Sequence, residues 1–397
     1  MLTIKRLFMA LALLPAIAQA HLHPAYSHDA DTGYRNPDWM SVVPDSTPLR
    51  LMSIPGTHDT MSFYGGDIVQ TQSASLPVQM ESGIRYFDIR CRHIQNTFAI
   101  HHGLVYQKTM FGDVLNSMVD FLKRHPGETL LVNVQEEYTP ANNSRSFEQT
   151  FAEYHTRYAG YIWLPTSQKP ILGETRGKIV FVQNFAGEKT WGLKGDSFQG
   201  DNPWVLNTNW DLYNKWEKVK GNLRLAAANA STGSILNGLS GSTGAFPYFV
   251  ASGHSSPGTG APRLATGLTT PGWNGSYPDF PRVNCFWGIC TIAFEGTNTL
   301  TYQYIQATRP SYVGIVVADF PGGGLIDSVL ELNYRACGRW QDRGVATLGQ
   351  VFIHYHAPTG RHRYFKARKT GPYAAFPGSQ TSNADWQYLG EDKRCRA

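Results

Sequence analysis

The chain has 397 residues, and its 42% hydrophobic and 16% charged residues are typical of a folded globular protein rather than a disordered or fibrous one. The net charge of +5 is concentrated near the C-terminus, where residues 338–397 hold ten Lys or Arg and four Asp or Glu. The rest of the chain has no surplus of positive charge, which argues against an enzyme that acts on nucleic acid.

The first 20 residues have the composition of a signal peptide. Lys5 and Arg6 form a basic start, residues 7–17 are apolar, and Ala-Gln-Ala at 18–20 is a small-residue cleavage site. We therefore expect residues 1–20 to be removed and the protein to be secreted. An N-terminal membrane anchor or a buried helix is the alternative, although the apolar stretch is shorter than the ~20 residues that span a bilayer.

Residues 21–48 are polar and are expected to form an extended arm that packs on the main domain, which runs to residue 336. Within this domain, strand-like apolar runs occupy Leu51–Ile54, Tyr86–Ile89, Phe98–His101, Leu130–Gln135, Ile179–Gln183, Tyr248–Ala251 and Val313–Ala318. Runs with helical spacing alternate with them at Leu76–Ser82, Met110–Arg124, Ser146–Tyr158, Thr299–Ala307 and Leu325–Tyr334. This alternation indicates a parallel sheet, and polar residues at the C-terminal ends of the strands favour a (β/α) barrel over a doubly wound sheet. We predict an α/β barrel over residues 21–336.

Three short motifs in this domain carry groups that can cleave a phosphodiester without a metal. They are SIPGTHD at 53–59, YFDIR at 86–90 and IHHG at 100–103. The histidines can act as a general base and a general acid, since the pKa of imidazole lies near working pH. The arginine offers a planar fork to phosphate oxygens, and the carboxylates can fix the histidine tautomers.

In this order and spacing, the three motifs resemble the X domain of bacterial phosphatidylinositol-specific phospholipase C. Arg176–Val180 and Val317–Phe320 support the resemblance, which covers residues 38–336. It implies an irregular, incompletely closed TIM-type barrel that cleaves phosphatidylinositol or its glycosylated forms to diacylglycerol and inositol 1,2-cyclic phosphate. It also implies no cofactor and a peripheral contact with the membrane surface. We expect a monomer.

The resemblance assigns roles to the histidines. His58 would be the general base on the inositol 2-hydroxyl, which then attacks the neighbouring phosphorus atom. His102 would be the general acid for the diacylglycerol oxygen. Adjacent residues of a strand face opposite sides, so only one of His101 and His102 can enter the site, and the resemblance selects His102.

Charged residues complete this catalytic set. Arg90 would clamp the phosphate. Asp88 lies two residues before it and faces the same way, so it would hold Arg90 or the 2-hydroxyl, with a buried structural ion pair as the alternative. By resemblance, Asp319 supports the general base and Asp59 supports the general acid.

The sequence departs from the bacterial pattern at two substrate-binding positions. Glu136 stands where the bacterial enzymes have a lysine, and Asn184 stands where they have an arginine that contacts inositol. Metal-dependent relatives carry a calcium-binding glutamate near the first position, but they also have a carboxylate where this chain has Arg90. A metal ion beside Arg90 is electrostatically unfavourable. We therefore expect no metal, with Glu136 paired to Arg90 or to a sugar hydroxyl.

Two other functions stay open at this stage. A calcium-dependent barrel phosphodiesterase would use Asp59, Asp88 and Glu136, and sensitivity to a chelator would reveal it. A secreted binding protein or adhesin on the same barrel would have no need for two positioned proton carriers.

Residues 252–297 form a long insertion that is rich in Gly, Pro and Ser. Loops of this length are usually functional or disordered, and the aromatic residues argue against disorder. The insertion is expected to follow the strand at 248–251 and so to lie on the active-site face. Either it packs its own aromatic residues as a rim loop, or it contacts a membrane or substrate. These aromatic residues include Trp273, Tyr277, Phe280, Phe286 and Trp287.

The five cysteines show no metal-binding spacing and are expected to be structural. Cys285 and Cys290 enclose four residues, which suits a disulfide across a tight loop. Cys337 and Cys395 bracket the C-terminal segment, and a bridge between them would staple a small domain. Cys91 is predicted to be the unpaired thiol.

Residues 337–397 are predicted to form a small β-rich accessory module. Basic residues at 361–369 are interleaved with Tyr364 and Phe365. We expect these aromatic residues to be exposed and the module to be a targeting device that binds an anionic membrane or a polysaccharide. The alternative is a cap that covers the bottom of the barrel.

Overall fold

The computed structural model describes residues 23–230, 233–257, 261–334, 338–339, 344–346, 348–356, 361–373 and 384–391. The predicted signal peptide and the predicted Cys337–Cys395 bridge lie outside the described residues. Within the described chain, no helix combines the length and the apolar character needed to cross a membrane.

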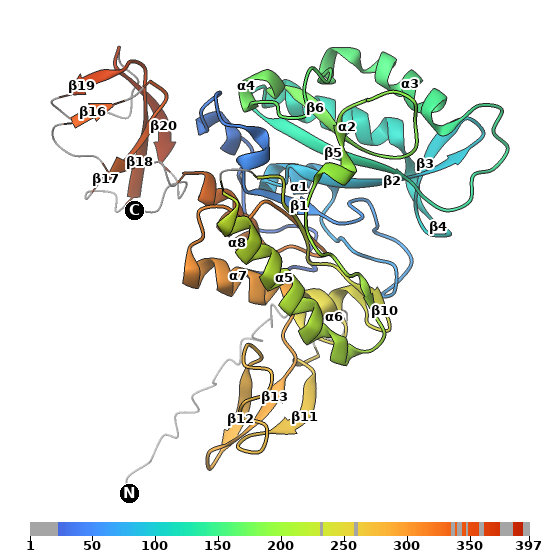
Figure 1. The fold of residues 1–397 in the computed structure, drawn as a ribbon, viewed down its shortest axis with the longest axis vertical. Coiled ribbons are helices and arrows are strands. Elements are labelled where there is room, and N and C mark those ends of the chain that lie inside the picture. The colour runs from blue at the N-terminus through green and yellow to red at the C-terminus, as the bar shows by residue number, and fades with distance from the viewer. Residues whose placement is uncertain are drawn as a thin grey trace, which may run out of the picture.

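A curled parallel sheet forms the centre of the molecule (Figure 1). Along its main path the strands follow the order β7–β6–β5–β2–β1–β14–β9, and each neighbouring pair is parallel. The predicted α/β class and TIM-type barrel are thereby confirmed. The strands are β1 Ile54–Thr57, β2 Tyr86–Ile94, β5 Thr129–Glu136, β6 Lys178–Asn184, β7 Leu193–Lys194, β9 Leu236–Gly238 and β14 Ile315–Ala318.

The main path of the sheet ends at β7 and β9, so the barrel is irregular where these two strands approach each other. A parallel bridge between Gln199 and Ile235 joins the chain that follows β7 to the start of β9. Two short strands, β8 (Val205–Leu206) and β10 (Ser242–Thr243), pair with each other in this half of the molecule. The incomplete barrel agrees with the expectation from the sequence.

An antiparallel extension continues the sheet from the outer end of β2. It consists of β3 (Thr97–His102) and β4 (Val105–Met110). The turn before β3 contains Gln95 and Asn96, both with positive φ, as in the two-residue turns that suit hairpins. The predicted strand at 98–101 therefore exists, but it is antiparallel and not one of the parallel barrel strands.

Helices pack on the outside of the sheet (Figure 1). The amphipathic α2 buries Phe111, Leu115 and Met118, and it ends at the predicted His-Pro-Gly stop. All five predicted helical runs contain helix. The α-helices are α1 Leu76–Ser82, α2 Phe111–Arg124, α3 Phe147–Arg157, α4 Leu172–Thr175, α5 Leu212–Ala228, α6 Pro247–Ser252, α7 Thr297–Thr308 and α8 Gly323–Leu330.

Three elements differ from the prediction. The expected strand at 248–251 is the helix α6. The prediction failed because all residues of α6 are buried, and a short run that is apolar on every side has no period that distinguishes a helix from a strand. The first strand begins at Ile54, after a 3₁₀ turn at Leu49–Leu51. The long helix α5 was missed, since it buries polar residues such as Lys215 and Asn222 on its inner face.

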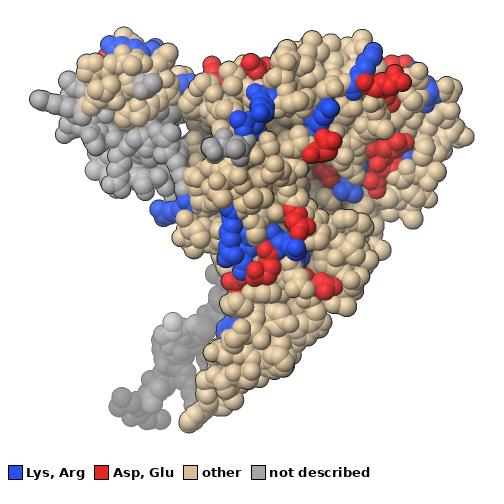
Figure 2. All heavy atoms as spheres, in the orientation of Figure 1, with Lys and Arg blue, Asp and Glu red and all other residues tan. Residues whose placement is uncertain are grey.

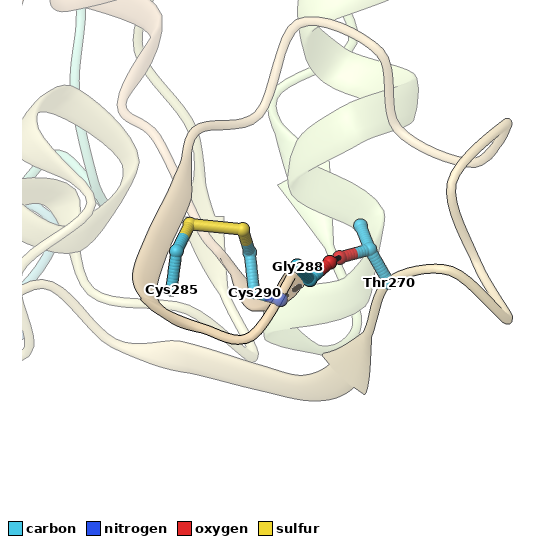
Figure 3. Close-up of a disulfide and its surroundings, with 4 residues drawn as sticks. All are labelled: Thr270, Cys285, Gly288 and Cys290. Atoms are coloured by element: carbon cyan, nitrogen blue, oxygen red, sulfur yellow. Dashed lines mark hydrogen bonds between the residues drawn. A yellow bond between two sulfur atoms is a disulfide. The ribbon is translucent and has the colours of Figure 1, made fainter.

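The insertion at 252–297 therefore follows a helix, contrary to the prediction that it follows a strand. It holds a three-stranded antiparallel sheet that projects from the body of the protein (Figure 1). The predicted Cys285–Cys290 disulfide joins β12 to β13 (Figure 3), and Cys91 is the unpaired, buried cysteine among the described residues, as predicted. The strands are β11 Ala265–Thr269, β12 Arg282–Phe286 and β13 Ile289–Ala293.

The C-terminal segment forms the predicted small β-rich module. Phe365 and Trp386 belong to its own core, while Tyr364 faces the opposite way and joins the core cluster of the barrel. The expectation that Tyr364 and Phe365 are exposed is therefore wrong, since both are buried. Its strands are β15 Gly338–Arg339, β16 Gly344–Ala346, β17 Val351–His356, β18 Arg361–Ala367, β19 Gly371–Tyr373 and β20 Trp386–Glu391.

Candidate active site

A cavity of about 600 Å³ opens at the C-terminal ends of the barrel strands. Asp59 lies buried directly beside the cavity lining. Glu136 is exposed and does not line the cavity. The other six residues predicted for the site do line it: His58, Asp88, Arg90, His102, Asn184 and Asp319.

The sheet register brings His58 and Asp319 together. Their preceding residues, Thr57 and Ala318, are paired across the parallel strands β1 and β14. His58 Nδ1 lies 2.8 Å from Asp319 Oδ1. Burial disfavours the charged imidazole, but the Asp319 carboxylate outweighs this effect, so the pKa of His58 is raised from its ordinary value.

Arg90 binds the other ring nitrogen of His58. Its Nη2 lies 2.7 Å from His58 Nε2. A guanidinium can only donate, so Nε2 accepts this hydrogen bond and the ring proton sits on Nδ1, facing Asp319. The contacts therefore select the tautomer in which Nε2, on the cavity side, is able to take up a proton.

Asp88 fixes the position of Arg90. Its Oδ2 accepts hydrogen bonds from Arg90 Nε at 3.2 Å and from Arg90 Nη2 at 3.1 Å, and it also accepts one from the backbone N–H of Asp59. Asn133 donates to Oδ1 at 2.8 Å. Burial alone would raise the pKa of Asp88, but the charges of Arg90 and His58 and these hydrogen bonds lower it. Asp88 thus holds Arg90, the first of the two partners predicted for it.

His102 approaches the cavity from the end of β3. Its Nδ1 lies 2.8 Å from the carbonyl oxygen of Val69, 3.0 Å from Ser62 Oγ and 3.1 Å from Asp59 Oδ2. A carbonyl oxygen can only accept, so Nδ1 carries a proton and Nε2 is the atom available for proton exchange. His101 instead turns toward Gly103 and is buried. The geometry agrees with the selection of His102.

Asp59 is the least well satisfied charged group of the site. It is fully buried, and neither carboxylate oxygen accepts a well-aligned hydrogen bond, although Oδ2 lies 3.7 Å from Arg90 Nε. Burial raises the pKa of Asp59 to about 6, against the opposing charges of Arg90 and His102. Its contact with His102 is the one expected from the sequence.

The predicted pairing of Glu136 with Arg90 is wrong, and the neighbouring Glu137 takes that place. Glu137 Oε2 lies 3.8 Å from Arg90 Nη1, and its Oε1 accepts a hydrogen bond from the backbone N–H of Gly103 at 2.7 Å. Side chains alternate along β5, so Asn133 and Gln135 line the cavity while Glu136 points away, and Glu137, directly after the strand, approaches Arg90. Counting this alternation from Asn133 would have selected the correct glutamate.

Other polar and aromatic residues of the cavity were not predicted. Gln135 accepts a hydrogen bond from Asn184 at 3.1 Å, and Asn133 and Ser62 orient the catalytic candidates. Phe198 and Trp204 come from the irregular chain after β7, where no sequence motif marks them. Across the residues that the structure describes, no group of three or more His, Cys, Asp or Glu side chains is arranged to hold a metal ion.

Comparison with known proteins finds a family match over part of this site. Residues 46–184 match the phosphatidylinositol-specific phospholipase C X domain. The resemblance found in the sequence is thereby confirmed over this segment, which contributes β1, β2, β3, β5 and β6 to the site.

Two curated relatives are similar over the same part of the chain. The 1-phosphatidylinositol phosphodiesterase of Listeria monocytogenes is 40% identical over 157 residues, covering 36% of this chain and 47% of the relative. The enzyme of that name from Staphylococcus aureus is 33% identical over 195 residues, covering 46% of this chain and 58% of the relative. The chain thus matches about half the length of these relatives.

The solved structures extend the likeness beyond this segment, to three quarters of the chain. The phosphatidylinositol-specific phospholipase C from Listeria monocytogenes aligns with a TM-score of 0.52 and 23% identity, covering 75% of this chain and 98% of that chain. At this identity the alignment shows a common fold.

Proposed function

We propose that this protein is a secreted, metal-independent phosphodiester lyase that acts on phosphatidylinositol or its glycosylated forms. The observation that carries the proposal is that His58 and His102 line one cavity. Each histidine has its Nδ1 beside a carboxylate, and Arg90 lies beside Nε2 of His58. The curated relatives, which are named as phosphodiesterases of this lipid, support the same activity.

In the proposed reaction His58 Nε2 removes the proton from the inositol 2-hydroxyl. The hydroxyl oxygen attacks phosphorus, and the bond between phosphorus and the diacylglycerol oxygen breaks. His102 Nε2 donates a proton to that leaving oxygen. The products are inositol 1,2-cyclic phosphate and diacylglycerol, so all atoms and protons are accounted for.

Arg90 would hold the phosphate during this step. Its Nη2, which bonds His58 before substrate binds, would donate to a phosphate oxygen and release Nε2 for the 2-hydroxyl. Asp88 keeps the guanidinium plane fixed, since it binds both Nε and Nη2. Gln135 and Asn184, which line the cavity, are suited to bind inositol hydroxyl groups.

The calcium-dependent alternative receives no support from the geometry. Its three ligands would be Asp59, Asp88 and Glu136, but Glu136 is exposed on the opposite side of β5. The other two carboxylates lie close to Arg90, at 3.7 Å and 3.1 Å. A divalent ion at this position would face a fixed positive charge.

Phosphorus NMR of the purified protein mixed with phosphatidylinositol tests the proposal. We expect a five-membered cyclic phosphate to form before any inositol 1-phosphate. Direct formation of the acyclic phosphate, or no turnover of this lipid, would contradict the proposed reaction. Detection of the mature N-terminus near residue 21 in culture medium tests secretion.

A further inference from the structure

The insertion builds a narrow aromatic arm, defined here as residues 265–293. Its register runs from the pair Ala265–Ala293, next to the body, to the pair Phe286–Ile289 at the outer end. The turn between β12 and β13 is therefore the tip, and Figure 1 shows the arm projecting below α6. The two central residues of this turn are Trp287 and Gly288.

The aromatic residues of the arm divide into two groups. At its base, Tyr277 and Phe280 stack on each other and pack on Tyr213 of α5. Outside this base the exposed apolar side chains are Trp287 at 89% exposure, Phe286 at 74%, Ile289 at 52% and Trp273 at 50%. The base thus packs its own aromatic residues, whereas the tip presents them to the surroundings.

The outer part of the arm has no charge of either sign. The charged residues of the arm are Asp279 and Arg282. Asp279 pairs with Lys220 of α5 at 2.6 Å, and the Arg282 guanidinium donates to four backbone carbonyl groups near the base. Figure 2 shows the consequence: the lower part of the arm carries no blue or red atoms.

Covalent and hydrogen bonds hold the tip in one shape. The Cys285–Cys290 disulfide closes the turn, and the N–H of Cys290 donates to Thr270 Oγ1 at 2.8 Å (Figure 3). Bracing of this kind reduces the entropy lost when the tip binds something.

Trp287 occupies a backbone position that is unfavourable for tryptophan. It has φ +49° and Gly288 has φ +81°, the pattern of a type I′ turn, in which Asn, Asp or Gly is preferred at the first position. A large side chain in this position is not explained by packing, because Trp287 is almost fully exposed. Strain at an exposed residue of this kind is a feature of contact sites.

We propose that the tip of the aromatic arm inserts into the interface of a lipid bilayer, with affinity that does not depend on anionic lipid. Tryptophan and phenylalanine favour the boundary between head groups and acyl chains, and an uncharged tip gains nothing from surface charge. A second copy of the chain is a poorer occupant. The four exposed side chains offer roughly 600 Å², below the ~800 Å² that each partner contributes to a stable interface.

This inference goes beyond the proposed function, because it concerns where the protein binds and not what it cleaves. Co-sedimentation of the full chain with phosphatidylcholine vesicles tests it, since this lipid carries no inositol. The test variant combines Phe286→Ser with Trp287→Asn, and asparagine suits the turn, so the arm should fold at least as well. Leu164→Ser is the matched control, because Leu164 is 61% exposed on a different part of the surface.

We expect the double variant to lower the partition coefficient at least 10-fold and the control to change it less than 2-fold. Raising the salt from 0.1 M to 1 M should not weaken binding of the unaltered protein. Equal binding of the double variant, loss of binding in salt, or a lipid-independent dimer that the double variant abolishes would each overturn the proposal. A protein that binds these vesicles through the tip but cleaves no phosphatidylinositol would refute the proposed function alone.

Discussion

Arg90 Nη2 and His58 Nε2 are joined at 2.7 Å, so the candidate phosphate clamp and the candidate base hold each other before a substrate arrives. Nε2 accepts the hydrogen bond from Arg90, so it cannot carry a proton while this contact lasts. Asp319 raises the pKa of His58, so the ring takes up a proton readily once the contact is broken. A substrate phosphate that takes over the arginine would therefore expose the base at the moment when the 2-hydroxyl is beside it.

Replacing either candidate proton carrier tests this arrangement directly. We expect His58→Ala and His102→Ala each to lower kcat by at least about 10²-fold, since general acid–base catalysis contributes 10²- to 10⁴-fold. The neighbouring His101→Gln is the control, because His101 faces away from the cavity, and it should keep kcat within about 3-fold of the unaltered enzyme. Circular dichroism checks that each variant is folded. Near-normal turnover in one of the alanine variants would remove that histidine from the mechanism.

The two adjacent glutamates of the β5 end offer a matched pair of substitutions. Glu137→Gln removes a carboxylate 3.8 Å from Arg90 that also accepts a hydrogen bond from the N–H of Gly103. We expect kcat/KM to fall about 3- to 10-fold, because the arginine and the loop after His102 lose a shared support. Glu136→Gln should change it less than 2-fold. If Glu136→Gln has the larger effect, the geometric correction of the sequence prediction is itself mistaken.

Sequence reasoning located the site well where chemistry and register coincide. His58 follows β1, His102 ends β3, and Arg90 lies on the same side of β2 as Asp88, so strand runs and side-chain alternation were enough to place them at one cavity. The residues of the substrate-binding side were less predictable. Glu136 was chosen by its match to a family position, whereas the alternation of side chains along β5 decides the contact in favour of Glu137.

The parts that escaped prediction have physical reasons in common. Helix α6 has apolar residues on all its faces, and α5 buries Lys215, whose ammonium donates to the carbonyls of Pro203 and Gly238. In both cases the hydrophobic period that marks a helix is absent or broken. Trp204 reaches the cavity from irregular chain, where only the tertiary fold determines the neighbours of a residue.

Chelation distinguishes the proposed mechanism from a calcium-dependent one. We expect 5 mM EDTA to leave turnover of phosphatidylinositol within about 2-fold, since Arg90 supplies the positive charge that a metal ion would otherwise provide. The measurement should use a soluble inositol phosphodiester as well, so that effects of calcium on vesicles are separated. Loss of activity with EDTA that calcium restores would favour the alternative. A magnesium control shows whether any rescue is specific.

Asp59→Asn should make the protein more stable and less active. The pKa of Asp59 in the folded protein is about 6, against an ordinary value of 3.8, because burial disfavours its charge. The folded state therefore favours the neutral carboxyl group. The resulting stability of the folded state is fully present below pH 4 and is lost as the pH rises through 6, where burial of the charged form opposes folding. The asparagine variant should gain about 3 kcal/mol in free energy of unfolding at pH 8 and nothing at pH 4, while kcat falls at least about 10-fold because His102 loses its carboxylate. Urea unfolding at the two pH values measures this, and equal gains at both would show that ionisation of Asp59 is not the cause.

The C-terminal module should brace the barrel, because Tyr364 of β18 lies buried in the core cluster of the barrel while its neighbour Phe365 fills the core of the module. Lys366 of the module also lies close to the barrel, since burial and the nearby Arg176 of the barrel lower the pKa of Lys366. We expect Tyr364→Ser to lower the melting temperature of the whole protein by several degrees, about 2–4 °C for each kcal/mol lost, with kcat on a soluble inositol phosphodiester unchanged. Val345→Ser, at an exposed position of the same module, is the control and should leave the melting temperature within about 1 °C. An unchanged melting temperature in Tyr364→Ser would contradict the bracing role.

A chain that ends at Tyr334 tests the alternative role of the module. If this chain kept its stability and its activity on the soluble substrate but no longer bound anionic vesicles or polysaccharide, the module would be a targeting device.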